Sequence, residues 1–517
     1  MGFDMKEKII RLLKDKYLYV FFIITLVFFG VFIRINYTTD TYAVIGMDHS
    51  LIIKNFFQSG RYITGLLFKI IFALNIGIVK TYLLSYFFAV IFATLSQYKL
   101  FSIIKQEITF KNRIKGIDFV LILITVLMII NPFSIELFFY IEKGIIVLSV
   151  LFSILAFEKT LEYLKLDLNT DKSKIVTKKK RQLVLMATLY MLGAMLCYQG
   201  TVGIFIVLSA IYIIKYSKKF KDFIKYTLVS CFIYGIPALL NVLSIKILFK
   251  GSRVSGEIVI LESIKKVFFG SERLFHTFEI LPKYTFIVFL SLIILLTIVL
   301  IIRSKNKLLN VVRLLYILII TYFIAIIPQL LQSTNNIWLV PRSTYTFACL
   351  FALIGLYIVN FFEKDLIEDN KRKGKYLITT LIGISALLVF VELYSFYKIE
   401  IQNYQVSFMD QQIALKVKEN IEKYESETNK TITKISIYGD KNRNWSYAGI
   451  HVIGDMNISA LSTSWSDSYM INYYIGRNLV LTDNDSEIKQ YFESIDYSAF
   501  SEGEIIIKED TLHFCTF

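Results

Sequence analysis

Long apolar blocks dominate this sequence and restrict the folds that it can adopt. Tyr17 to Ile33 contains no charged residue, and similar blocks recur along the first 396 residues. Blocks of about 18 or more apolar residues can cross the hydrocarbon core of a bilayer as helices. The composition agrees, because 55% of the residues are hydrophobic, whereas soluble proteins have about 45–50%. We therefore predict a polytopic α-helical membrane protein.

We expect about eleven membrane spans from these blocks. Their ranges are 17–33, 80–100, 117–130, 144–157, 183–197, 202–214, 226–249, 284–302, 311–331, 346–362 and 376–396. A further apolar stretch from Phe56 to Leu74 is interrupted by Gly60 and Arg61. It predicts an interfacial or re-entrant helix rather than a full span.

The positively charged residues are distributed along the chain as they are in membrane proteins. The chain has 57 Lys and Arg against 41 Asp and Glu, a net charge of +16. In a soluble protein this would suggest a nucleic-acid partner, but here the basic residues gather in alternate loops, as the positive-inside rule requires. We expect a lipid bilayer and no nucleic acid as partner. The basic residues Lys6, Lys8, Arg11, Lys14 and Lys16 place the N-terminus in the cytoplasm.

The last part of the chain differs in character. We divide the chain into a transmembrane domain, 1–396, and a small extracytoplasmic α/β domain, 397–517. In this second domain a helix is expected at Asp410–Tyr424, and strands at Ile432–Tyr438, His451–Ile453, Leu479–Leu481 and Glu504–Lys508. No motif in it points to chemistry. The four cysteines have no paired spacing, so neither a disulfide framework nor a metal site is predicted.

Ionisable residues collect in the loop after the first expected span. Asp40, Asp48 and His49 come first, and Gly60-Arg61 closes the loop. Glycosyl transfer needs a carboxylate that accepts the proton of the attacking hydroxyl. It also needs positive charge that stabilises a departing phosphate. Arginines can supply this charge, and a divalent cation is the one cofactor that we consider. We expect Asp40 and Asp48 to be catalytic, and Arg61 and His49 to bind substrate. The simpler alternative for Asp40 is a helix cap or a solvated loop carboxylate. For His49 it is a surface residue, and for Gly60-Arg61 a helix boundary with an interfacial anchor.

A second cationic position lies in a distant outer loop. Arg342 follows Pro341 in a loop that is otherwise uncharged and needs no positive charge for topology. The planar guanidinium matches phosphate, so we expect Arg342 to bind it. Glu136 precedes the aromatic run Phe138-Phe139-Tyr140 and is a second expected substrate residue, since sugar rings stack on aromatic faces. An interfacial anchor and an aromatic belt are the alternatives.

These motifs, in this order, resemble one family of membrane enzymes. They are Asp40 and Asp48 ahead of Gly60-Arg61-Tyr62, then Asn131-Pro132, then Pro341-Arg342. The family is the bacterial membrane glucosyltransferases that modify O-antigen and related surface polysaccharides. The resemblance implies a GT-C-like architecture, a polyprenyl-phosphate-linked sugar as donor, and a glycan or glycolipid as acceptor. It gives Asp40 the role of base with Asp48 assisting. Many members have two adjacent acidic residues where this chain has Asp40-Thr41, so the choice between the two aspartates stays open.

The function expected from the sequence is therefore sugar transfer, with glucose as the expected sugar, at the outer side of the plasma (inner) membrane. A polysaccharide polymerase that uses a lipid-diphosphate donor is one alternative. A lipid-glycan flippase, which is not an enzyme, is another, and it would need ionisable residues deep in the spans.

Overall fold

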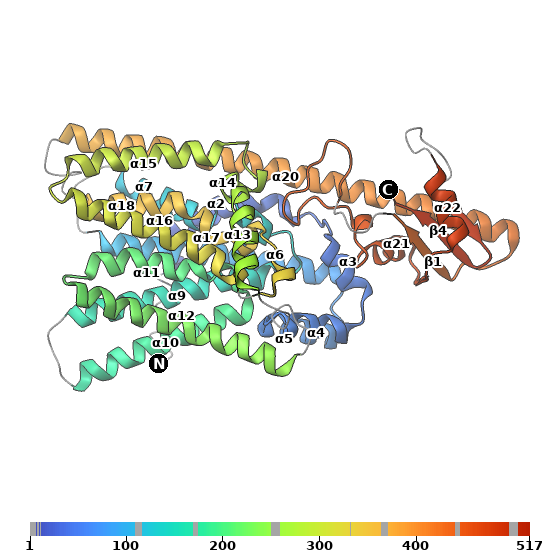
Figure 1. The fold of residues 1–517 in the computed structure, drawn as a ribbon, viewed down its shortest axis with the longest axis horizontal. Helices are drawn as coiled ribbons and strands as arrows, with labels where there is room; N and C mark the ends of the chain where they lie inside the picture. Colours follow the sequence, from blue (N-terminus) through green and yellow to red (C-terminus); the bar gives the residue numbers. More distant parts are fainter. Residues whose placement is uncertain are drawn as a thin grey trace.

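The computed structural model shows a bundle of long helices that carries a small sheet at one end (Figure 1). It describes residues 7, 10, 12–108, 116–168, 174–249, 259–330, 332–362, 371–439, 445–495 and 505–516. Three of the basic residues that predict a cytoplasmic N-terminus, Lys6, Lys8 and Arg11, lie outside these ranges.

Eight described helical stretches are long and apolar enough to cross a membrane. They are Lys16–Ile33 (α2, Lys16–Phe29, with η1, Gly30–Ile33), α6 (Ile78–Glu107), α9 (Lys143–Leu168), Gln199–Tyr216 (η2, Gln199–Thr201, with α11, Gly203–Tyr216), α12 (Phe220–Leu248), α15 (Thr285–Arg303), α16 (Lys307–Leu330) and most of α20 (Lys371–Thr428). Each matches one of the expected spans. The predicted helical architecture is confirmed, and these eight stretches are consistent with a multi-pass membrane protein by their length and composition.

The other three expected spans are helical but do not join this set. α7 (Ile117–Ile129) and α18 (Leu350–Phe361) are short, and α10 (Lys174–Cys197) carries a basic cluster, Lys178–Arg181. A helix as short as α7 rises only about 20 Å, against about 30 Å of hydrocarbon. Both short helices are enclosed by protein, since every residue from Val120 to Ile129 and from Leu350 to Val359 is buried. Their apolar character therefore reflects a helical core as much as a membrane span.

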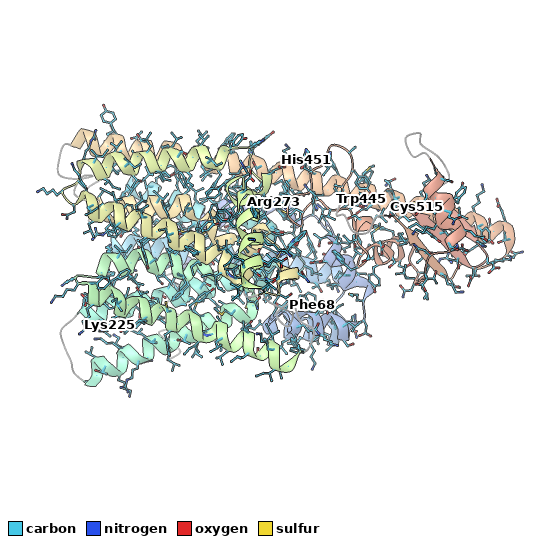
Figure 2. The ribbon with its side chains drawn as sticks, viewed as in Figure 1. Phe68, Lys225, Arg273, Trp445, His451 and Cys515 are labelled. Atoms are coloured by element: carbon cyan, nitrogen blue, oxygen red, sulfur yellow. The ribbon has the colours of Figure 1, made fainter. Side chains whose placement is uncertain are left out.

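The long helices pack around α9 and α11. α9 packs against α6, α10 and α11, while α11 also packs against α12, α16 and α18. At the end of the bundle away from the sheet, Lys225 forms an ion pair with Asp167, with its Nζ 2.5 Å from Asp167 Oδ2; Figure 2 shows Lys225 at this end. The opposite end carries short helices, several of which are labelled in Figure 1. They are α3 (Thr39–Gly46), α4 (His49–Gln58), α5 (Tyr62–Ala73), α8 (Ser134–Leu137), α13 (Ile260–Gly270), α14 (Glu272–Phe275), η3 (Thr277–Glu279), η4 (Thr334–Asn336), η5 (Pro341–Ser343) and α17 (Tyr345–Ala348).

The expected interfacial helix from Phe56 to Leu74 is in fact the end of α4 and the whole of α5, which pack on each other. The chain turns between them at Gly60, whose φ is +71°. The carbonyl of Gly60 accepts hydrogen bonds from the side-chain amides of Asn241 (2.9 Å) and Gln199 (3.0 Å). A Cβ at this position would lie 2.5 Å from Asn241 Oδ1, so only glycine permits both the turn and the close approach. This turn fixes the position of the next residue, Arg61.

The part of the chain after Thr428, with which α20 ends, is called the C-terminal segment here. α20 joins the bundle to this segment as one helix of 58 residues. The expected last span and the expected helix Asp410–Tyr424 are both parts of it, so the 396/397 boundary falls inside a continuous helix. At about 1.5 Å per residue it is far longer than a bilayer is thick. α20 therefore carries the chain from the bundle to the sheet without a linker, as Figure 1 shows.

The sheet has the order β2-β1-β4-β3. β1 (Lys434–Tyr438) is parallel to β2 (Val480–Leu481) and β4 (Thr511–Cys515), and β3 (Ile505–Lys508) is antiparallel to β4. Three expected strands match β1, β2 and β3, while β4 was missed. The expected strand His451–Ile453 is wrong, because Gly454 (φ +58°) turns the chain and leaves a single bridge between Ile453 and Met456. The remaining elements are η6 (Ala460–Ser462), α21 (Asp467–Ile475) and α22 (Ser486–Ser494).

The C-terminal segment is docked on the bundle through α3. α21 packs against α3, and the hydroxyls of Tyr42 and Tyr474 lie 3.0 Å apart. A Cβ on Gly46 would lie 2.0 Å from the ring of Tyr469, so this glycine permits the close packing of the two helices. α3 and the C-terminal segment are thus a single packed unit.

Candidate active site

Arg342 is the centre of a buried charged cluster. Its backbone N–H donates to Glu136 Oε2 at 2.6 Å, and its Nη1 lies 3.1 Å from Glu136 Oε1. Pro341 begins η5 and Glu136 lies in the single turn of α8, so two short helices hold the pair. The guanidinium also stacks on the ring of Tyr140, 4.2 Å from its centroid. The two residues predicted separately as substrate groups are therefore direct partners.

Asp455 is the second partner of Arg342 and comes from the C-terminal segment. Its Oδ2 lies 2.6 Å from Arg342 Nη2, and its Oδ1 accepts a hydrogen bond from Trp338 Nε1 at 3.1 Å. The Ile453–Met456 turn that presents it is inserted deeply, since Met456 is fully buried. Sequence reasoning missed this residue. The signal was Gly454-Asp455 between apolar residues, a pair typical of a two-residue turn.

Gly454 lets this turn approach the arginine loop. Its φ is +58°, and a Cβ here would lie 2.7 Å from Pro341 Cδ and 3.3 Å from Glu136 Oε1. A side chain would therefore separate Asp455 from its partners. The glycine is required both for the backbone conformation and for the close contact.

Arg61 forms a second ion pair beside the first. Its Nη1 lies 3.3 Å from Glu142 Oε1, and its guanidinium stacks on Tyr198 at 4.7 Å from the ring centroid. Its Nε is buried and has no hydrogen-bond partner among the described residues. A buried donor without a partner is costly unless a ligand or water satisfies it. Arg61 therefore has hydrogen-bonding capacity available for an anion.

Asp40 lies close to both ion pairs. It is in the first turn of α3, whose N-cap Thr38 accepts a hydrogen bond from the backbone N–H of Thr41. Its carboxylate contributes electrostatically to the pKa values of Arg342 and Glu142. The side chain is exposed, whereas Glu136 is completely buried. Of these carboxylates, Asp40 is the accessible one.

Burial and charge shift the pKa values in this cluster. Burial raises the pKa of Glu136 to about 7, against the lowering effect of Arg342. Burial likewise raises the pKa of Glu142, although Arg61 opposes the shift. Burial lowers the pKa of Arg342, but Asp455, Glu136 and Asp40 more than offset this and raise it, so the guanidinium stays charged. Shifted pKa values of side chains beside a cavity are typical of functional sites.

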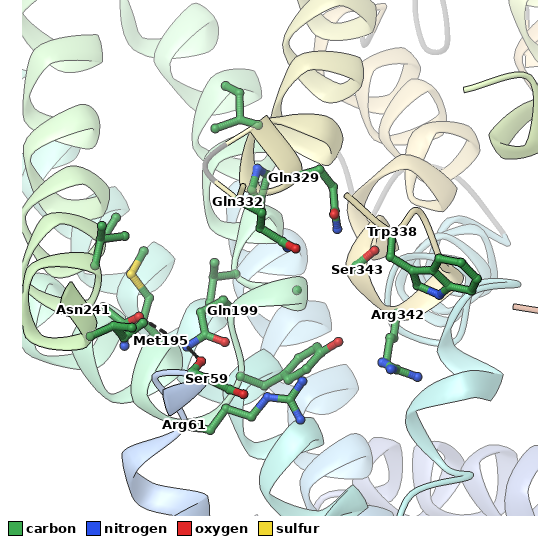
Figure 3. A pocket seen from close by; sticks show the side chains of 18 of the residues that line it. Ser59, Arg61, Met195, Gln199, Asn241, Gln329, Gln332, Trp338, Arg342 and Ser343 are labelled. Carbon is green, nitrogen blue, oxygen red and sulfur yellow. Dashed lines mark hydrogen bonds between the residues drawn. The ribbon is translucent and has the colours of Figure 1, made fainter. Parts of the chain in front are cut away.

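Two cavities meet at the arginines. The first, of about 200 Å³, lies between α12 and α16 and is lined mostly by apolar side chains, with Gln199, Asn241 and Gln329 among its polar groups (Figure 3). The second, of about 360 Å³, is more polar and is lined by Asp40, Glu142 and Trp465 among others. The residues that line both are Gln58, Ser59, Arg61 and Arg342. The two guanidinium groups thus lie on the wall shared by an apolar and a polar cavity.

Asp48 and His49 are placed elsewhere. Asp48 is the N-cap of α4, and its Oδ1 accepts the backbone N–H of Ser50 at 2.6 Å. Hydrogen bonds from Ser50 hold the pKa of Asp48 below its usual value. The His49 ring stacks on Phe72 with centroids 3.8 Å apart. Neither residue lines the two cavities. The structure therefore brings together Asp40, Arg61, Glu136 and Arg342, while Asp48 caps α4 away from them.

Metal binding and similarity to known proteins add no further assignment. Among the described residues no group of three or more His, Cys, Asp or Glu side chains is arranged to hold a metal ion. Asp40 could contribute one ligand to a divalent cation whose remaining ligands came from a phosphate and water. Comparison with sequence profiles of known protein families gave no match, and comparison with curated protein sequences gave none either.

Proposed function

We propose that this protein is a membrane glycosyltransferase that moves a sugar, with glucose as the first candidate, from a polyprenyl-phosphate donor to a glycan or glycolipid. The reaction takes place at the outer side of the plasma (inner) membrane, in a GT-C-like arrangement. Asp40 is the base, and Arg61 and Arg342 hold the donor phosphate.

The observation that carries this proposal is the position of the two arginines between the two cavities. A lipid-linked sugar phosphate has an apolar chain, an anionic phosphate and a polar sugar in that order. The apolar cavity, the guanidinium pair and the polar cavity occur in the same order. Guanidinium groups are well matched to phosphate oxygens. The order of these regions therefore matches the order of the apolar, anionic and polar parts of such a donor.

The exposed faces around the apolar cavity support a lipid donor. The cavity lies between α12 and α16, and both helices pack on α11. α12 exposes Leu239, Leu240 and Leu243 in the same region, and α16 exposes Phe323. Side chains of this kind are favourable in contact with lipid. A polyprenyl chain could thus reach the cavity from the bilayer.

The chemistry assigned to the polar cavity is a displacement at the anomeric carbon. The acceptor hydroxyl oxygen forms a bond to that carbon while the bond to the phosphate oxygen breaks. Asp40 accepts the hydroxyl proton, and the two electrons of the broken bond leave with the polyprenyl phosphate. Arg61 and Arg342 stabilise the charge that develops on this leaving group. Asp40 is suited to the task because it is the accessible carboxylate of the cluster.

The location of the charged cluster favours an enzyme over a transporter. All of its members lie in short helices and loops at one end of the bundle. They are Asp40, Arg61, Glu136, Glu142, Arg342 and Asp455. A transporter would need ionisable groups along a path through the spans. Glu392 in α20 is a buried carboxyl group within a span, but it does not line either cavity.

The orientation can be tested with single cysteines. We expect Ser464→Cys, near the sheet, to react with an impermeant thiol reagent in intact cells, and Lys305→Cys, at the opposite end, to react only after lysis. Both positions are exposed. Cys231, the exposed native cysteine, is replaced by serine in both variants. The reverse labelling pattern would put Asp40 in the cytoplasm and exclude an outer-side donor.

The activity is tested with the full chain in proteoliposomes. The donors are radiolabelled glucosyl polyprenyl phosphate and, in parallel, a polyprenyl diphosphate-linked glucose; the acceptor is a glycolipid extract of bacterial envelopes. We expect label to pass from the monophosphate donor to the extract. Elongation from the diphosphate donor would show a polymerase. Movement of labelled lipid between leaflets without transfer would show a flippase.

A further inference from the structure

The polar cavity has an aromatic side chain on the side formed by the C-terminal segment. Trp465 lines it together with Asp40 and Tyr140, and the tryptophan is 43% exposed. Its position in the lining of the cavity leaves part of the indole face available to a ligand there. In contrast, Trp338 donates its indole N–H to Asp455 and so is part of the charged cluster.

The turn that carries Trp465 is rigid. The backbone N–H groups of Ser466 and Asp467 both donate to the carbonyl of Thr463, at 3.1 Å each. The hydroxyls of Thr463 and Ser466 lie 2.5 Å apart, and that of Ser466 donates to the carbonyl of Ala460 at 2.6 Å. Thr463, Ser466 and Asp467 are all fully buried. Trp465 is thus an exposed ring on a fixed, hydrogen-bonded support.

Trp465 also has a fixed relation to Asp40. Trp465 lies two residues before the start of α21, and Asp40 is in the first turn of α3. α3 and α21 are packed on each other through Tyr42 and Tyr474, and through Gly46. The aromatic ring and the carboxylate therefore belong to one packed unit and face the same cavity.

We infer that Trp465 is the platform on which a pyranose ring of the acceptor stacks, with the attacking hydroxyl directed toward Asp40. This assignment rests on the proposed function and adds the acceptor subsite to it. The C–H face of a pyranose is apolar while its edge carries hydroxyls, so it suits an aromatic face beside carboxylates and guanidinium groups. The acceptor class is therefore a neutral hexopyranoside unit, and the C-terminal segment provides its binding surface.

The test measures binding without requiring turnover. The full chain in lipid nanodiscs is titrated with methyl β-glucopyranoside and methyl β-galactopyranoside, and binding is followed by saturation-transfer NMR. We expect transfer to the ring C–H protons in the wild type and about tenfold weaker binding for Trp465→Ala, the order expected for loss of one aromatic face. Trp465→Phe should stay within about threefold because a ring remains. The control is Tyr491→Ala, which removes an exposed aromatic residue on α22 outside this cavity.

Two outcomes would overturn this inference. One is unchanged hexoside binding by Trp465→Ala. The other is that brominated lipids quench a fluorescence component that Trp465→Phe lacks, which would make Trp465 a bilayer anchor. Failure of the proposed function looks different, because the hexosides would bind at Trp465 while no polyprenyl-phosphate sugar is consumed. Consumption of donor with no hexoside binding at Trp465 would refute this inference alone.

Discussion

Arg342 Nη2 and Asp455 Oδ2 lie 2.6 Å apart, and this ion pair joins the helical bundle to the C-terminal segment. Glu136, which precedes Arg342 in the sequence, forms an ion pair with Nη1 of the same guanidinium. A guanidinium has five N–H donors, so two carboxylates can orient it and still leave donors for a ligand. The C-terminal segment therefore takes part in the site instead of merely covering it.

Asp455→Asn tests whether this pair positions Arg342. The amide keeps the size of the side chain but removes its charge, so Glu136 is left as the charged partner of the guanidinium in this pair of carboxylates. We expect kcat to fall about tenfold, as for the loss of one charge-assisted hydrogen bond. The KM for the anionic donor should not rise, because a negative charge has been removed from beside the phosphate position. Kinetics with the purified full chain separate the two parameters.

Gly454→Ala provides a second perturbation of the same contact. The φ of +58° costs an alanine about 1–2 kcal/mol, and the new methyl group meets Pro341. The Asp455 carboxylate should move away from Arg342, with the same loss of kcat as in Asp455→Asn. Gly449→Ala is the matched control, since Gly449 also has positive φ but has open space around it. Equal activity of all three variants would show that the turn has only a structural role.

Arg342→Lys tests the fork geometry of the phosphate site. Lysine keeps the charge but loses the planar fork whose two terminal nitrogens engage Glu136 and Asp455 separately, so we expect transfer to fall by two orders of magnitude or more. Arg61→Lys should cost less, because among the described residues Arg61 forms one ion pair, with Glu142 at 3.3 Å. Transfer is measured in membranes with protein amounts matched by immunoblot. Wild-type rates for both variants would make these arginines interfacial anchors.

Much of the fold follows from the sequence because membrane helices are encoded locally. An apolar block predicts a helix with no knowledge of its neighbours, so all eleven expected blocks are helical. Whether a block crosses the membrane depends on what surrounds it. α7 and α18 are buried by other helices, which their own residues cannot show. β4 was missed for a related reason, since a strand at the end of the chain is defined by its pairing with β1.

The residues of the candidate site could be predicted where a charged side chain stands at an unexpected position in the sequence. Arg342 was identified because the expected topology did not require it, and Glu136 because it lies beside the aromatic run Phe138-Phe139-Tyr140. Asp455 was missed because a carboxylate in a polar segment is ordinary, and only the fold places it beside Arg342. Asp48 was included because it is near Asp40 in sequence, but the helix that it caps turns it away from the cavities.

The buried carboxyl of Glu136 predicts a pH effect on activity. Burial raises its pKa to about 7, and its charged form is the one that holds Arg342. Transfer should therefore fall as the pH drops through about 7, because the protonated carboxyl no longer balances the guanidinium. Glu136→Gln should lower the rate overall and remove this acidic limb. The measurement is a pH–rate profile of kcat for both proteins.

The effect of Glu136 on stability should have the opposite sign. Its pKa is higher in the folded protein than the ordinary value of about 4.3 in the unfolded chain, so the folded state binds the proton more tightly. Its contribution is complete below the unfolded value and is lost as the pH rises through about 7. The thermal midpoint of the wild type, relative to Glu136→Gln, should thus be higher at pH 5.5 than at pH 8. A difference that does not change with pH would show that Glu136 titrates outside this range.

Asp40→Asn tests the base directly. The amide keeps size and hydrogen bonding but cannot accept a proton, and a positioned base typically contributes about 10²–10⁴-fold to the rate. Transfer should fall by that order while binding of the polyprenyl-phosphate donor survives, because Arg61 and Arg342 are untouched.

Asp48→Asn is the matched control in the same loop. Asparagine is as good an N-cap as aspartate, so this variant should transfer at close to the wild-type rate. A dead Asp48→Asn with an active Asp40→Asn would assign the base to Asp48, against its position on α4. Normal transfer by both variants would exclude the α3–α4 region from the chemistry and leave the flippase as the stronger hypothesis.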